Sequence, residues 1–223
     1  MMNKRAIESP MKSEPMNETD PYRVVETEVL ERLYGTPSPA SIRKEVNYLH
    51  PHYRAFVNAS PFAILATSGP GGLDASPRGD APGFVTVQDE KTLLIPDRRG
   101  NNRIDSLRNI ISDPRVALLF LVPGIGETLR VNGSAHISID PDLLQRFAVN
   151  GKAPSSVLVV KIETVYFQCS RAILRSNIWD PSRQIDRKEL PSTGDILSAL
   201  SQCEIDGEKY DREWPERVKT TLY

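Results

Sequence analysis

The chain has 223 residues, of which 39% are hydrophobic and 26% are charged, and its formal net charge is -1. This length favours one domain with appendages. The nearly balanced charge excludes a global positive field that would hold a nucleic acid, so any binding of an anion must be local. No apolar run approaches the ~20 residues that cross a bilayer. The only cysteines, Cys169 and Cys203, lie outside any metal-ligand spacing. We therefore expect a cytoplasmic protein with no metal site and no nucleic-acid or membrane partner.

The part of the chain before residue 60 is expected to be peripheral. Residues 1–20 are polar and contain two prolines, which predicts a flexible N-terminus. Residues 21–59 carry short apolar periodicities, which predict a helical lead-in. We expect a helix that ends near Gly35, a second that follows Ser41 and uses Val46, and a third from Pro51 to Asn58.

The residues from 60 to 180 contain short apolar runs that are typical of strands. The strongest is 115–122, and the alternating run 128–139 indicates a strand with one solvent-exposed face. Tight turns separate most of these runs. The pattern predicts a mainly β domain, an antiparallel six-stranded barrel with small helices at its ends. Residues 181–223 are highly charged, and we expect them to form a helical C-terminal appendage.

One stretch, from Asp74 to Asn109, has the strongest functional signal. It predicts two strands, a basic loop and the start of a helix, for which Asn101 or Asn102 would be the N-cap. Arg98, Arg99 and Arg103 surround this helix start. A helix N-terminus and guanidinium groups both attract an anion, most simply a phosphate. The alternative is a solvated basic turn before an ordinary helix.

Three segments also carry a family resemblance: FAILATSGPGGLDASPRGDAPGFV, TLLIPDRRGNNRIDSLRNIISDPRVALLF and ETLRVNGSAHI. In this order they resemble the pyridoxamine 5′-phosphate oxidase-like, FMN-binding split-barrel family. The resemblance covers roughly residues 60–179. It is closer to an uncharacterised subgroup of that family than to the vitamin-B6 oxidases themselves.

The resemblance implies a homodimer with FMN at the subunit interface and assigns residues to it. The phosphate would lie on Asp97, Asn101, Asn102 and Arg103, and the flavin ring would lie against Gly83 and Phe84. The second subunit would supply Thr128, with Arg130 close by. Arg78 stands near a position where the oxidases carry an arginine, and it is expected to pair with Asp80. Arg175 shares a helix face with Arg171 and would also reach the cofactor.

The implied activity is that of an oxidoreductase that moves a hydride between FMN and an unidentified small molecule. No catalytic residue is assigned. Pyridoxamine phosphate is not expected as the substrate, because the oxidases' C-terminal substrate-phosphate motif has no clean counterpart in this chain. Two alternatives stay open: a flavin-binding or flavin-storing module without turnover, and a deazaflavin- or haem-handling relative built on the same barrel.

Overall fold

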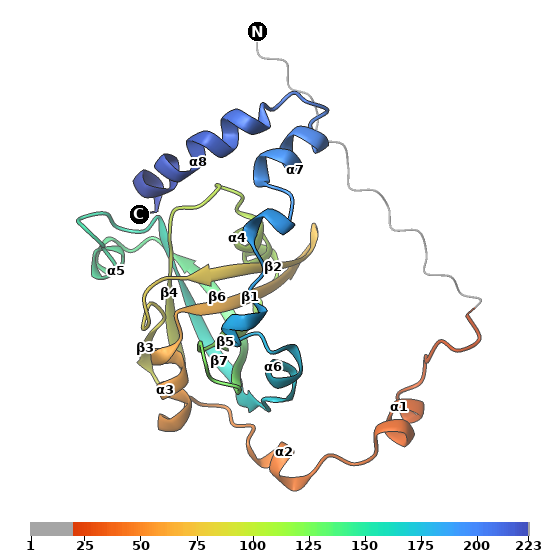
Figure 1. Ribbon diagram of the computed structural model, residues 1–223. Coiled ribbons are helices and arrows are strands. Elements are labelled where there is room, and N and C mark those ends of the chain that lie inside the picture. Colours follow the sequence, from red (N-terminus) through yellow and green to blue (C-terminus); the bar gives the residue numbers. More distant parts are fainter. Residues whose placement is uncertain (1–19, 223) are drawn as a thin grey trace. The chain divides into compact units, whose positions relative to one another are not determined.

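A computed structural model describes residues 20–222 of the chain (Figure 1). The segment predicted to be flexible, 1–20, lies outside the described residues except for its last member. The chain divides into two compact units, and the boundary falls between Ile42 and Arg43. The predicted domain boundaries after residues 59 and 180 stay predictions. Within residues 20–222, no helix combines the length and the apolar character needed to cross a membrane.

The first unit contains helix α1, Thr27–Tyr34, and most of helix α2, Pro39–Arg43. Gly35 ends α1 with a positive φ of 70°, and its N–H donates to the carbonyl of Glu31. This confirms the predicted helix end, because glycine adopts that backbone conformation without steric cost.

The predicted helix after Ser41 is wrong in its extent. Helix α2 ends at Arg43, and Val46 exchanges two backbone hydrogen bonds with Val165 as an isolated antiparallel bridge. The apolar spacing fits a helix, but these tertiary backbone bonds outweigh local preference. Helix α3, Pro51–Ala59, begins and ends close to the predicted residues.

The second unit is built on one antiparallel sheet of seven strands, not the six that we predicted. The strands are β1 Phe62–Gly69, β2 Gly72–Gly79, β3 Thr86–Asp89, β4 Thr92–Asp97, β5 Arg115–Leu121, β6 Thr128–Ser138 and β7 Ser156–Gln168. Their order in the sheet is β2-β1-β5-β6-β7-β4-β3, so β2 and β3 are edges and the sheet does not close on itself. The short β3 pairs with β4 alone, at one edge of the sheet.

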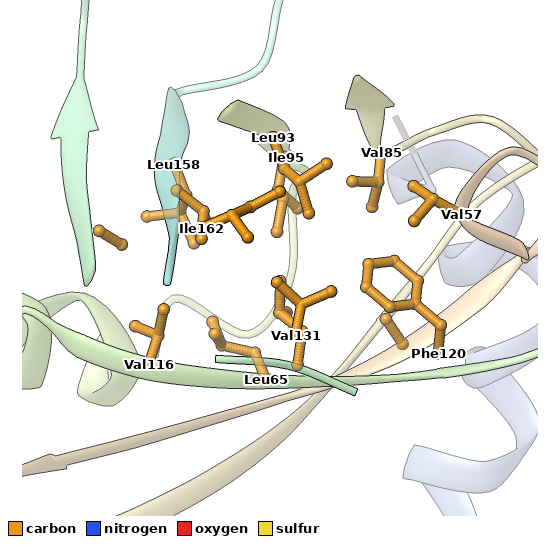
Figure 2. Close-up of a cluster of buried hydrophobic side chains, with 14 of the residues drawn as sticks. Val57, Leu65, Val85, Leu93, Ile95, Val116, Phe120, Val131, Leu158 and Ile162 are labelled. Carbon is orange, nitrogen blue, oxygen red and sulfur yellow. The ribbon is translucent and has the colours of Figure 1, made fainter. Parts of the chain in front are cut away.

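The core lies between two facing sets of strands. Leu65, Phe120 and Val131 of β1, β5 and β6 point toward Ile95 and Leu158 of β4 and β7 (Figure 2). All five side chains are fully buried. The strands therefore wrap around one apolar interior, as expected for a split barrel whose strands alternate inward and outward side chains.

The remaining helices are α4 Asp105–Ser112, α5 Pro141–Arg146, α6 Arg171–Ser176, α7 Thr193–Leu200 and α8 Gly207–Thr221, with 3₁₀ turns at Pro181–Arg183 and Arg187–Glu189. Helix α4 connects β4 to β5. A side chain at Gly194 would meet the carbonyl oxygen of Gly207 at 2.1 Å. The α7–α8 pair therefore depends on a close crossing of two glycine backbones.

Candidate functional site

A cavity of about 620 Å³ lies where β2, the end of β4 and the start of α4 come together. Six of the predicted cofactor residues line it: Arg78, Phe84, Asp97, Asn101, Asn102 and Arg103. The volume is in the range of pockets that bind cofactors and other small molecules. The structure thus brings together residues that are up to 25 positions apart in the chain (78 to 103).

Strand alternation places the polar residues of β2 at this cavity. Asp74, Ser76 and Arg78 are two residues apart, so they share one face of the strand. On the other side, Asp97 ends β4 and is paired in register with Ser156 at the start of β7. Two separate parts of the sheet therefore supply the walls of the cavity.

The loop before α4 differs from the sequence-based prediction. The helix begins at Asp105, its N-cap residue is Ile104, and no side chain caps it. Instead, Asn101 Oδ1 accepts a hydrogen bond of 3.0 Å from the backbone N–H of Arg103, and Asn102 has a left-handed φ of 59°. Asparagine tolerates this conformation and closes turns with its side chain. The two asparagines therefore shape the loop, and neither is the N-cap.

Two arginines at the cavity are held by aspartates. The Arg78 guanidinium donates to Asp97 at 2.5 Å, and both side chains are 19% exposed. Arg98 donates to Asp80 at 3.0 Å and to the carbonyl oxygen of Phe147 at 2.6 Å. The ion pairs of this corner are therefore Arg78 with Asp97 and Arg98 with Asp80, whereas we expected Arg78 to pair with Asp80. These ion pairs fix the guanidinium groups and offset their charge.

The charge of the other two arginines at the cavity is less offset by carboxylates. Arg103 pairs with Asp105 at 2.9 Å, but its side chain is 77% exposed, so solvent screens this pair. Arg99 forms no ion pair with any residue of the described chain. Arg99 and Arg103 are therefore the cations of this loop that are best able to meet an anion.

A chain of hydroxyl groups lies at the start of α4. Ser106 Oγ donates to the carboxylate of Asp74, and the Oγ atoms of Ser76 and Ser106 are 3.0 Å apart. An ionised carboxylate only accepts, so Ser106 uses its one proton there and accepts from Ser76. Asp74 and Asp105 both lie near this helix end and offset its partial positive charge. Attraction for an anion must therefore come mainly from the arginines.

Two buried polar atoms at the cavity have no hydrogen-bond partner among the described residues: Arg78 Nε and Ser156 Oγ. Buried donors are satisfied in nearly all native proteins, so each such atom calls for an explanation. Both residues line the cavity, so a polar ligand there would provide one. The donors around this cavity match a ligand that carries oxygen acceptors and a negative charge.

Four of the predicted cofactor residues do not line this cavity. Gly83 has a φ of 86° and forms the turn before Phe84, while Arg175 lies on α6. Thr128 is buried at the start of β6, and Arg130 donates to the hydroxyl of Tyr166 at 2.8 Å. Thr128 and Arg130 were expected from the second subunit, and their roles stay predictions.

The structure adds cavity residues that the sequence analysis did not select: Asp74, Ser76, Ser106, Ser155 and Ser156. The alternation of β2 was a usable signal for the first two, because they share a strand face with Arg78. Ser155 and Ser156 carried no local signal, since only the pairing of β4 with β7 brings them here. Among residues 20–222, no group of three or more His, Cys, Asp or Glu side chains is placed to hold a metal ion.

Fold and cavity together define a class: an antiparallel β protein with a polar, arginine-rich cavity at a strand–loop–helix corner. The sequence profile described as "Pyridoxamine 5′-phosphate oxidase" matches residues 49–169. This is more than half of the chain, and the protein belongs to that family. Membership associates it with flavin-related, oxidoreductase-like function. A comparison with curated proteins gives no significant match.

Several solved structures are similar over about half of this chain. HupZ of Group A Streptococcus is 16% identical, with 54% of this chain and 94% of that chain covered and a TM-score of 0.45. General Stress Protein 26 of Bacillus anthracis is 18% identical, with 51% and 88% covered and a TM-score of 0.38. A protein named F420 reductase is 21% identical, with 52% and 97% covered and a TM-score of 0.39. At these TM-scores the likenesses carry no further argument.

Proposed function

We propose that this protein is a homodimeric FMN-binding oxidoreductase and that the arginine-rich cavity holds the cofactor. The observation that carries the proposal is the cavity itself. It has the volume of a cofactor pocket, it lies within the family-matched region, and two buried polar atoms of its lining residues lack partners. We further propose that the protein acts in the cytoplasm, where the exposed, unpaired Cys169 and Cys203 would stay reduced.

In this proposal Arg99 and Arg103 hold the phosphate, because neighbouring carboxylates offset their charge least. The turn built by Asn101 and Asn102 fixes the backbone from which these arginines project. Arg78 and Ser156 would donate to oxygens of the ligand deeper in the cavity. Phe84, which is buried at the cavity wall, offers the apolar surface against which a flat ring packs.

FMN, when bound, supplies the exchange of a hydride with a small molecule. The protein's part is to bind, orient and tune the cofactor. The Arg78–Asp97 pair holds one wall in a fixed position and presents a guanidinium group without a large net charge. Thr128 and Arg130 of the second copy would face the ring, where the cation favours the negative charge of the reduced form.

The first test is the absorbance spectrum of the freshly purified protein. We expect a flavin spectrum, with FMN released into solution on denaturation. A colourless protein that does not bind added FMN would overturn the proposal, and a spectrum typical of haem or of a deazaflavin would replace the cofactor. Bleaching by NADH or NADPH, followed by reoxidation with an added acceptor, separates an enzyme from a storage module.

The second test addresses the shared site. If one subunit binds the phosphate and the other supplies Arg130, then Arg103→Ala and Arg130→Ala homodimers should both be impaired. Mixed dimers of the two variants contain one intact site, so mixing should restore up to half of the wild-type activity in each heterodimer. No recovery after verified subunit exchange would place both arginines in the same subunit's site.

A further inference from the structure

A second cavity, of about 490 Å³, lies in the same unit and shares no residue with the first. It is bounded by the segment that starts at Arg43, by α3, and by the adjoining ends of β6 and β7. Its walls are almost entirely apolar, and three aromatic residues contribute to them: Tyr53, Phe56 and Phe167. The family assignment and the proposed FMN site leave this cavity without a role.

The aromatic walls are held in place. Tyr53 and Phe167 have ring centroids 6.4 Å apart, and the hydroxyl of Tyr53 donates to the carbonyl oxygen of Lys44 at 2.7 Å. Burial raises the pKa of Tyr53, so its ring stays a neutral wall at physiological pH. Phe56 and Phe167 also pack against the main core. The cavity is therefore a preformed apolar pocket with fixed aromatic walls, which suits an apolar ring.

The polar groups at the edge of this cavity are mostly hydrogen-bond donors. Lys44 Nζ lies 4.8 Å from the ring centroid of Phe167, and Arg43 also lines the cavity. His50 Nδ1 accepts from the backbone N–H of His52 at 3.2 Å, so the neutral ring carries its proton on Nε2. Glu127 is the one carboxylate among the lining residues that the structure describes. The excess of positive charge and donors favours a ligand with a negative charge.

The cations at this edge are also free of competing carboxylates. Within the described part of the chain, none of Arg43, Lys44 and Glu127 forms an ion pair. This distinguishes the second cavity from the first, where Arg78 and Arg98 are already held by aspartates. Lys44 lies over the rings of Tyr166 and Phe167 and has no carboxylate partner among the described residues, so it is able to give a charge-assisted hydrogen bond to an entering anion.

We propose that this second cavity binds a planar aromatic carboxylate, with the ring against Tyr53, Phe56 and Phe167 and the carboxylate on Lys44. Binding at this site does not depend on FMN, so it should occur whether or not the first cavity contains a flavin. The aromatic walls recognise the apolar ring of the ligand, and the donors at the edge of the cavity recognise its negative charge.

Isothermal titration calorimetry of the full chain with 2-naphthoate tests the proposal. We expect binding at one site per chain, weaker binding of the neutral 2-naphthylmethanol, and still weaker binding of the cationic 2-naphthylmethylammonium. Lys44→Met keeps the apolar stem and removes the charge, and it should weaken 2-naphthoate binding about tenfold or more, as expected for a charge-assisted hydrogen bond. Glu127→Gln removes a like charge and should strengthen it.

Matched controls separate this site from the cofactor cavity and from nonspecific attraction. Lys161→Met removes an exposed lysine of β7 that lines neither cavity, and it should leave 2-naphthoate affinity unchanged. Arg103→Ala should also leave it unchanged, and saturating FMN should not displace the probe. Absence of binding, equal affinity for the cationic analogue, equal affinity of Lys44→Met, or displacement by FMN would each overturn the proposal.

Discussion

The two cavities of the barrel unit differ in the side chains that line them and in what holds those side chains in place. The first is lined by charged and polar side chains, and its walls are held by the Arg78–Asp97 and Arg98–Asp80 ion pairs. The second is lined by aromatic rings that pack against the core, and its cations are left unpaired at the edge. The difference shows two ways to make a rigid site. In the first cavity ion pairs hold the charged side chains, and in the second packing against the core holds the aromatic rings.

The largest expected effect comes from the core that both cavities share. Phe120 on β5 is 1% exposed and packs in the main apolar cluster. Phe120→Ala should lower the free energy of unfolding by about 3–5 kcal/mol, because it removes buried apolar contacts and leaves a void. Urea denaturation measures the change. Phe62→Ala, at a position that is 38% exposed, is the control and should cost far less.

The second prediction concerns the cations of the polar cavity. Arg103→Ala should weaken FMN binding by about 1.5–3 kcal/mol, the contribution of a hydrogen bond to a charged group. Fluorescence titration with FMN and with riboflavin, which lacks the phosphate, measures it. Arg115→Ala, which removes an exposed arginine of β5, serves as the control. An equal loss for both flavins would show that Arg103 does not contact the phosphate.

The third prediction tests whether ion pairs hold the polar cavity. Asp97→Asn leaves the guanidinium of Arg78 without its carboxylate at a site that is 19% exposed. We expect a loss of about 1–3 kcal/mol in the free energy of unfolding, since a partly buried charge loses its partner. Thermal and urea denaturation at neutral pH would measure it. A stability equal to that of the wild type would mean that solvent replaces the aspartate.

The fourth prediction tests the aromatic wall of the second cavity. Tyr53→Phe keeps the ring and removes one hydrogen bond to Lys44, which should cost about 0.5–1.5 kcal/mol. Burial raises the pKa of Tyr53 above its ordinary value of 10.0. Between pH 10 and the folded-state pKa only the unfolded chain ionises this group, so the stability that is present below pH 10 is lost as the pH rises through the folded-state pKa. The variant should lack that alkaline loss. Tyr22→Phe, at an exposed position, should retain it.

The smallest expected effect is at a surface ion pair. The Arg115 guanidinium donates to Asp113 and lowers the pKa of that carboxylate to about 2, from 3.8. A lowered folded-state pKa gives stability that is present above pH 3.8 and is lost as the pH falls through about 2. Asp113→Asn should therefore remove a small, solvent-screened contribution at pH 7 and flatten the acid limb of the stability curve by the same small amount. A large loss at pH 7 would show that this pair resembles Arg78–Asp97 after all.

The sequence predicted several residues that line the polar cavity, but it did not predict which of their side chains form ion pairs with each other. Arg78, Asp97 and Arg103 were assigned to the cofactor from the family resemblance, and they do line one cavity. The partners of these side chains were not predictable in the same way. Arg78 pairs with Asp97, 19 residues away, and the nearby Asp80 pairs with Arg98. The second cavity was not anticipated, since it joins residues from 43 to 167 that share no motif.

Local patterns in the chain were sufficient for several elements. Gly35 ends a helix, the apolar run 115–122 forms a strand, and so does the alternating run 128–139. These preferences act over a few residues and can be recognised in any short segment. Tertiary structure decided that Val46 bridges to Val165, that Ser156 lies beside Asp97, and that α4 begins at Asp105. Such contacts depend on strand order and register, which are set by packing the whole sheet around one core.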